Sequence, residues 1–180
     1  MKVLFFVRHY SYLRLFESAI EGLAARGHQV TLAADHSEVM GGRQMVERLA
    51  ARYPGLVRAA VDRYGVADLF DLAETTHRYE SRYLDKVVGP LPEAAALYRE
   101  RSPVNHAAEI KVPLLVLQGD RDNTVPKAQA DALVDALRRT GATVEYHVYE
   151  GEGHGWSKPE TVSDELERAE KFLTRWVLKR

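Results

Sequence analysis

One histidine of the chain lies among glycines in a pattern that suits proton transfer. His154 belongs to the stretch GEGHGW (151–156), in which Gly151, Gly153 and Gly155 alternate with other residues. Glycine permits sharp backbone bends, so the imidazole is left uncrowded at the end of a strand-like segment. Imidazole exchanges protons readily in the physiological pH range. The pattern therefore predicts a histidine that serves a nucleophile.

Two carboxylates follow another strand-like segment about thirty residues upstream. The apolar run VPLLVLQG (112–119) leads into GDRDNTVP (119–126), which contains Asp120 and Asp122. In open α/β sheets, ligands bind at the carboxyl ends of the strands. A carboxylate bonded to one imidazole nitrogen fixes the tautomer and stabilises the imidazolium. The two loops together predict an acid–histidine pair, although each alone is also typical of a polar turn.

Alternating strand and helix patterns predict the sheet that would place these loops. We expect an α/β fold in three layers, with one mainly parallel sheet of about five strands and helical crossovers. The last three strands should lie side by side in sequence order. The strands are expected at 2–7, 29–34, 58–64, 113–118 and 143–149, with helical segments at 13–27, 41–55, 67–101, 126–141 and 160–178.

The composition is that of a soluble globular protein. The chain has 180 residues, 46% of them hydrophobic, and a formal net charge of −1. These values favour a single domain and predict neither nucleic acid nor membrane as a partner. Cysteine is absent from the sequence, which excludes disulfides, thiolate zinc sites and a cysteine nucleophile. We find no signal peptide, membrane-span or metal-ligand pattern, so we expect a cytoplasmic protein without metal or cofactor.

From about residue 59 to the C-terminus, the sequence resembles the catalytic domain of prolyl-oligopeptidase-type serine peptidases. The resemblance rests mainly on AAVDRYGVADL, VPLLVLQGDRDNTVP and YEGEGHGW, which follow the family's order and spacing. It implies part of an α/β-hydrolase fold, with peptide or acyl-ester substrates. It also implies that Asp122 is the acid and His154 the histidine of a catalytic triad. Asp120 is not at the matching position and is expected to be a turn residue.

The nucleophile of such hydrolases has no recognisable motif in this chain. It normally lies in G-x-S-x-G on a tight strand-to-helix turn, and that motif does not occur in the sequence. Counting back from RYP (52–54) puts Met40 in its place, and a thioether cannot attack a carbonyl carbon productively. Ser37 is the nearest hydroxyl; it is a candidate nucleophile or, alternatively, a turn residue. We therefore predict that the chain keeps Asp122 and His154 but has weak activity or none.

The N-terminal third of the chain resembles a different family. The stretch MKVLFFVRHYSYLRLFESAIEGLAARGHQVTLAA is similar to the opening strand–helix–strand unit of two-domain glycosyltransferases that use nucleotide sugars. The two resemblances together predict a chimera of two α/β segments, 1–57 and 58–180, within one domain. Arg8, His9 and Tyr10 follow the first strand, where they either contact a ligand or cap the strand end.

Three hypotheses from different classes stay open. The chain is a serine-type peptidase or esterase that uses an unrecognised hydroxyl, a catalytically silent engineered or recombined α/β scaffold, or a module that binds a nucleotide sugar. We also expect a homodimer or larger homo-oligomer, because half a hydrolase sheet leaves apolar surface and strand edges uncovered.

Overall fold

The structure, a computed structural model, describes residues 2–9, 17–36, 58–75 and 83–178. The predicted helix 41–55 lies outside these residues. The described elements are β1 (Lys2–His9), α1 (Glu17–Ala25), β2 (Gln29–His36), β3 (Ala60–Arg63), α3 (Leu69–Thr75), α4 (Tyr83–Val87), α5 (Ala95–Arg101), the 3-10 helix η2 (Pro103–Glu109), β4 (Leu114–Gly119), α6 (Lys127–Arg139), β5 (Val144–Tyr149), α7 (Pro159–Leu173) and the π-helical turn η3 (Thr174–Leu178).

The strands pair in parallel, as expected for an α/β fold, but they form two separate ladders. β1 pairs with β2, whereas β3, β4 and β5 pair in that order. The order of the last three strands confirms the prediction. The prediction of one continuous sheet of about five strands needs correction. Among the described residues, β2 and β3 lie in contact, but no hydrogen-bonded ladder joins them. β3 has four residues against eight in β2, so it offers few backbone groups for pairing.

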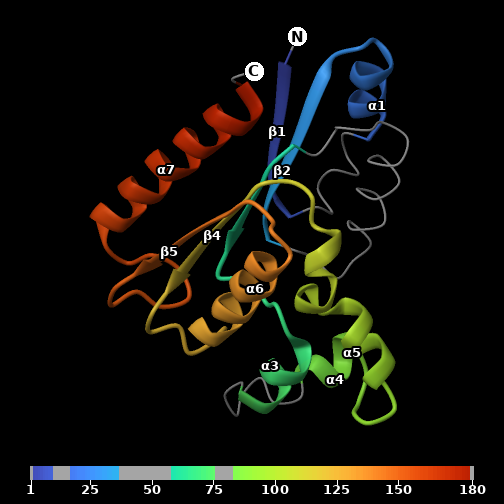
Figure 1. Ribbon diagram of the computed structural model, residues 1–180, viewed down its shortest axis with the longest axis vertical. Coiled ribbons are helices and arrows are strands. Elements are labelled where there is room, and N and C mark those ends of the chain that lie inside the picture. Colours follow the sequence, from blue (N-terminus) through green and yellow to red (C-terminus); the bar gives the residue numbers. More distant parts are fainter. Residues whose placement is uncertain (1, 10–16, 37–57, 76–82, 179–180) are drawn as a thin grey trace.

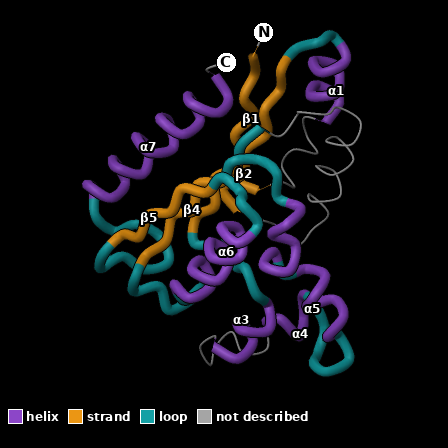
Figure 2. Tube along the Cα trace, in the orientation of Figure 1, coloured by secondary structure: helices purple, strands orange, loops and turns teal. Residues whose placement is uncertain are grey.

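Helices cover both faces of the three-stranded sheet. Figure 1 shows α6 on one side of β4 and β5 and α7 on the other, and the tube in Figure 2 shows the same layers. In β4, Leu114 and Val116 belong to the core under α6. Leu115 and Leu117 alternate with them and belong to the core under α7, together with Phe172. The unbroken apolar run of β4 is thus the pattern of a central parallel strand covered on both faces.

Within the described residues, helices occupy the segments predicted as helical at 13–27, 67–101, 126–141 and 160–178. The chain leaves α1 through Gly27, which has φ +75°, as is typical of a helix C-terminus. The segment predicted as mostly helical over 67–101 contains the short helices α3, α4 and α5, and η2 follows it without having been predicted. None of the described helices has the length and apolar composition needed to cross a membrane.

Candidate active site

The loop between β4 and α6 encloses the carboxylate of Asp122. The side chain of Asp122 is fully buried. Oδ1 accepts hydrogen bonds from the backbone N–H groups of Thr124 (2.9 Å) and Val125 (2.8 Å), and Oδ2 accepts one from Nε2 of Gln118 (3.2 Å). Burial tends to raise the pKa of Asp122, but the hydrogen bonds and the charge of His154 outweigh burial and lower the pKa. The site therefore holds a buried, ionised carboxylate.

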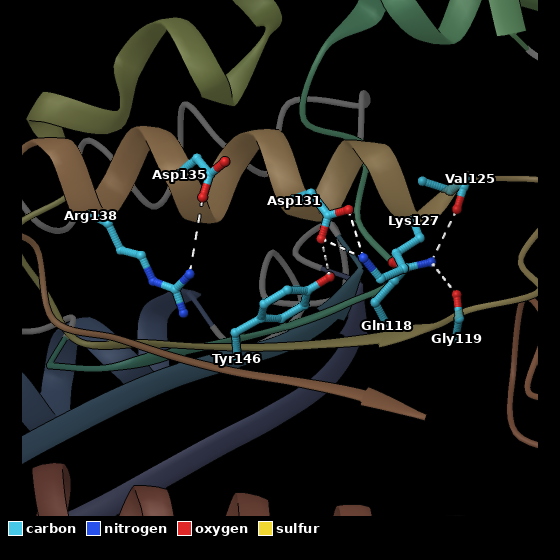
Figure 3. A network of polar contacts seen from close by, with 8 residues as sticks. All are labelled: Gln118, Gly119, Val125, Lys127, Asp131, Asp135, Arg138 and Tyr146. Atoms are coloured by element: carbon cyan, nitrogen blue, oxygen red, sulfur yellow. Dashed lines mark hydrogen bonds and ion pairs between the residues drawn. The ribbon is translucent and has the colours of Figure 1, made fainter. Parts of the chain in front are cut away.

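Gln118 supports this loop from inside the protein and is itself fully buried. Its Nε2 also donates to the carbonyl oxygens of Gly119 (3.3 Å) and Val125 (3.1 Å), and Figure 3 shows these bonds at the start of α6. One amide group thus ties the end of β4 to the turn that carries Asp122. The sequence signal for this role is a single polar residue at the end of an otherwise apolar strand, but Gln118 was not among the predicted site residues.

A second polar network attaches the first half of α6 to β5. Asp131 accepts hydrogen bonds from Nζ of Lys127 (2.7 and 2.8 Å) and from Oη of Tyr146 (2.8 Å), as Figure 3 shows. Burial, reinforced by the hydrogen bond to Asp131, raises the pKa of Tyr146. The phenol is therefore a hydrogen-bond donor at neutral pH, and the helix after the acid loop is fixed against the strand before the histidine loop.

The loop after β5 bends sharply around His154. Gly151 has φ +74° and Gly155 has φ +108°, a backbone region that favours glycine. Gly153 and Gly155 form an isolated antiparallel bridge, one on each side of His154. The side chain of His154 is 35% exposed, so the imidazole reaches solvent from the bend.

The two loops meet at the carboxyl edge of the sheet, because β4 and β5 are parallel neighbours. Nδ1 of His154 lies 2.9 Å from Oδ2 of Asp122. A carboxylate only accepts hydrogen bonds, so Nδ1 carries the proton of this bond. The structure therefore brings together the two predicted side chains, whereas their catalytic role stays a prediction.

Asp120 lies outside this pair. Its Oδ1 accepts a hydrogen bond from the backbone N–H of Gly151 (2.6 Å), and its own N–H donates to the carbonyl oxygen of Tyr149 (3.2 Å). It therefore joins the acid loop to the histidine loop through the backbone, which is a turn role.

The two loops also approach each other at Gly119. A Cβ atom at this position would lie 2.4 Å from the carbonyl oxygen of Glu152, so only glycine permits the observed distance. Gly119 opens the loop motif GDRDNTVP, but its contact with Glu152 joins two loops that are distant in the sequence, so no local pattern predicted it.

A second carboxylate, that of Glu152, is buried inside the histidine loop and stabilises the loop through hydrogen bonds. Oε2 accepts hydrogen bonds from N–H and Oγ of Ser157 (2.8 and 2.7 Å), and Oε1 accepts one from N–H of Lys158 (3.0 Å). Burial tends to raise the pKa of Glu152, but hydrogen bonds from Ser157, Thr161 and Lys158 outweigh burial and lower the pKa to about 2. The histidine loop is thus closed around an ionised carboxylate.

Aromatic rings lie against His154. The ring of Tyr64 is 4.6 Å from that of His154, centroid to centroid, and 5.3 Å from that of Trp156. Nε1 of Trp156 donates to Oε2 of Glu165 on α7 (2.6 Å), so the indole is held in the packed layer under α7. Tyr64 was not among the predicted site residues, because its contact with His154 joins two distant parts of the sequence.

Ser37, Met40 and Tyr10 lie outside the described residues, so the identity of the nucleophile stays a prediction. Arg8 and His9 end β1. Ligand binding by the N-terminal segment likewise stays a prediction.

A family model and several known proteins match most of this chain. The sequence model of the prolyl oligopeptidase family matches residues 39–180. Dipeptidyl aminopeptidase BIII of Pseudoxanthomonas mexicana is 32% identical over 112 residues, which are 59% of this chain and 16% of that protein. Dipeptidyl peptidase family member 6 of Caenorhabditis elegans is 28% identical over 172 residues, which are 92% of this chain and 23% of that protein. The solved structure of a puromycin-hydrolyzing peptidase of Mycobacterium tuberculosis has a TM-score of 0.73 and 31% identity, covering 89% of this chain and 24% of that one.

The chain therefore spans less than a quarter of the length of these three proteins. The matches extend across the predicted junction between 1–57 and 58–180, since the family model begins at residue 39 and the nematode protein aligns with 92% of the chain. These matches do not show the glycosyltransferase origin expected for the first segment.

Proposed function

Because this chain belongs to the prolyl oligopeptidase family, we propose that it is a peptidase- or esterase-like hydrolase segment in which His154 is the general base. Asp122 is the acid partner of that base. The observation that carries the proposal is the 2.9 Å contact between Nδ1 of His154 and Oδ2 of Asp122, a carboxylate that is otherwise buried. With Nδ1 engaged, Nε2 is the nitrogen that accepts a proton.

The proposed step on an ester or amide has two proton movements. Nε2 of His154 takes a proton from the attacking oxygen as that oxygen bonds to the carbonyl carbon. The imidazolium then returns the proton to the leaving group as the tetrahedral intermediate collapses. Throughout, Asp122 accepts the hydrogen bond from Nδ1–H and stabilises the imidazolium.

Water is the proposed attacking group, with the Ser37 hydroxyl as the alternative. General-base assistance to water accelerates hydrolysis by about 10²–10⁴-fold, far less than a complete triad provides. We therefore propose slight activity on small acyl esters and peptides. The relatives include a dipeptidyl aminopeptidase and a puromycin-hydrolyzing peptidase, and their activities favour this substrate class.

A catalytically silent scaffold, recombined from two α/β segments at about residue 57, is the second candidate. The observation in its favour is that the sequence contains no G-x-S-x-G motif.

Hydrolysis of 4-nitrophenyl acetate distinguishes the two candidates. We expect a slow steady rate without an initial burst of nitrophenol, since no acyl-enzyme accumulates. The rate should fall to the uncatalysed background in His154→Ala, fall in Asp122→Asn, and stay unchanged in Ser37→Ala. His147→Ala is the matched control, because it removes another partly exposed histidine at β5, away from Asp122.

A fluorophosphonate probe, which labels activated serines, completes the test. A stoichiometric burst together with labelling that Ser37→Ala abolishes would replace water by Ser37 as the nucleophile. A rate at background in the unmodified protein would support the silent scaffold and refute the hydrolase proposal.

A further inference from the structure

Tyr64 has an unusual backbone for an aromatic residue. It follows β3 directly and has φ +43°, the one positive φ among the described residues other than glycine. Bulky side chains rarely adopt this conformation, which packing must stabilise. The backbone N–H of Tyr64 donates to the carbonyl oxygen of Leu117 (2.8 Å), so the residue is fixed to β4. The strained conformation directs the ring towards the candidate site instead of along the strand.

The Tyr64 ring packs directly on the proposed base. It is 9% exposed, and its centroid lies 4.6 Å from that of His154, with the two planes inclined by 55°. On the side of Nδ1, a single hydrogen bond to Asp122 holds the imidazole. One hydrogen bond fixes the position of one atom but leaves the ring free to tilt, so a packed neighbour is needed to fix the plane.

The Tyr64 ring is itself held from behind. It meets the Trp156 ring edge to face at 5.3 Å. Trp156 donates from Nε1 to Oε2 of Glu165 (2.6 Å), and Glu165 forms an ion pair with Nε of Arg63 (2.7 Å). The side chain of Glu165 is 8% exposed, so this ion pair is largely shielded from water. Strand β3 and helix α7 thus hold a rigid aromatic platform beside the histidine loop.

We propose that Tyr64 is a positioning residue that fixes the plane of the His154 ring, so that Nε2 faces the substrate. Tyr64 acts through His154 and not on the substrate. The inference rests on the proposed function in one respect, since it concerns the ring assigned there as the base.

Two substitutions separate positioning from folding. Tyr64→Asn removes the ring while suiting the backbone, because asparagine tolerates positive φ. Tyr64→Phe keeps the ring. In Tyr64→Asn we expect the His154-dependent hydrolysis of 4-nitrophenyl acetate to fall by about 10- to 100-fold, the effect of a misplaced catalytic group. The NMR signals of the His154 ring protons should also lose the ring-current shift that Tyr64 causes. Tyr64→Phe should keep both properties.

The NMR signals decide the inference independently of activity. Nuclear Overhauser contacts between the two rings are expected in the unmodified protein, and their absence would overturn the inference even if Tyr64→Asn did not fold. Unchanged His154 signals and an unchanged rate in Tyr64→Asn would also overturn it. If hydrolysis by the unmodified protein does not depend on His154, the proposed function fails, while the ring contacts and shifts still test the positioning by Tyr64.

Discussion

Replacing Gly119 by alanine tests how closely the acid loop and the histidine loop must approach. The new Cβ would lie 2.4 Å from the carbonyl oxygen of Glu152, and 2.7 Å from both the carbonyl carbon of Glu152 and the carbonyl oxygen of Gly153. All three are backbone atoms, so no side-chain rotation relieves the overlap. Since Cβ contacts below 3.0 Å essentially do not occur, one loop must move by at least 0.6 Å (3.0 − 2.4).

This movement would also shift the two residues of the proposed catalytic pair relative to each other. Asp122 follows Gly119 by three positions, and His154 follows Glu152 by two. A 0.6 Å displacement along the bond would lengthen the Nδ1–Oδ2 distance from 2.9 Å to 3.5 Å (2.9 + 0.6), the outer limit of a hydrogen bond. Overpacking of this kind costs about 1–3 kcal/mol in free energy of unfolding. We therefore expect loss of both stability and hydrolysis.

Urea unfolding and hydrolysis of 4-nitrophenyl acetate measure the two effects on the same preparation. Gly22→Ala is the matched control, because the residue lies inside α1 and an alanine Cβ there meets no atom of the described residues within 4 Å outside the backbone of its own helix. The free energy of unfolding of the control should rise by about 0.5–1 kcal/mol, the usual effect of replacing a helical glycine by alanine. An unchanged urea midpoint and an unchanged rate in Gly119→Ala would show that the loops adjust without loss, and would refute the reasoning.

Three other predictions concern stability and assembly. The folded pKa of Glu152 is about 2, below its ordinary value of 4.5. The stability it contributes is therefore present above pH 4.5 and lost as the pH falls towards 2, and Glu152→Gln should flatten the acid side of a plot of melting temperature against pH. Gln129→Leu should lower the free energy of unfolding, measured in urea, by about 1–3 kcal/mol for each backbone N–H group that it leaves unpaired. It removes the buried acceptor of the Ala67 and Asp68 N–H groups (2.9 and 2.8 Å). Light scattering should show a mass above that of the monomer, and a monomer at high micromolar concentration would contradict the expected self-association.

Features that depend on local pattern could be predicted from the amino-acid sequence. The apolar run of β4 predicted a strand covered on both faces, because burial on each side removes the need for alternating polar residues. The glycines around His154 predicted a sharp bend, because their backbone freedom is a property of the residue type. The position of Asp122 at the end of the neighbouring strand followed from the parallel order of β4 and β5, which the alternating pattern implied.

The distant residues that complete the candidate site could not be predicted in this way, because they meet only when the helices and strands pack together. Tyr64 and His154 are ninety positions apart (154 − 64), and no periodicity relates them. The approach of Gly119 to Glu152 and the separation of the strands into two ladders likewise depend on how whole elements pack. A local pattern indicates whether a residue is buried and which backbone conformation it favours. It does not indicate which residue lies opposite across the packed surface, because the summed contacts of the helices and strands on either side determine that neighbour.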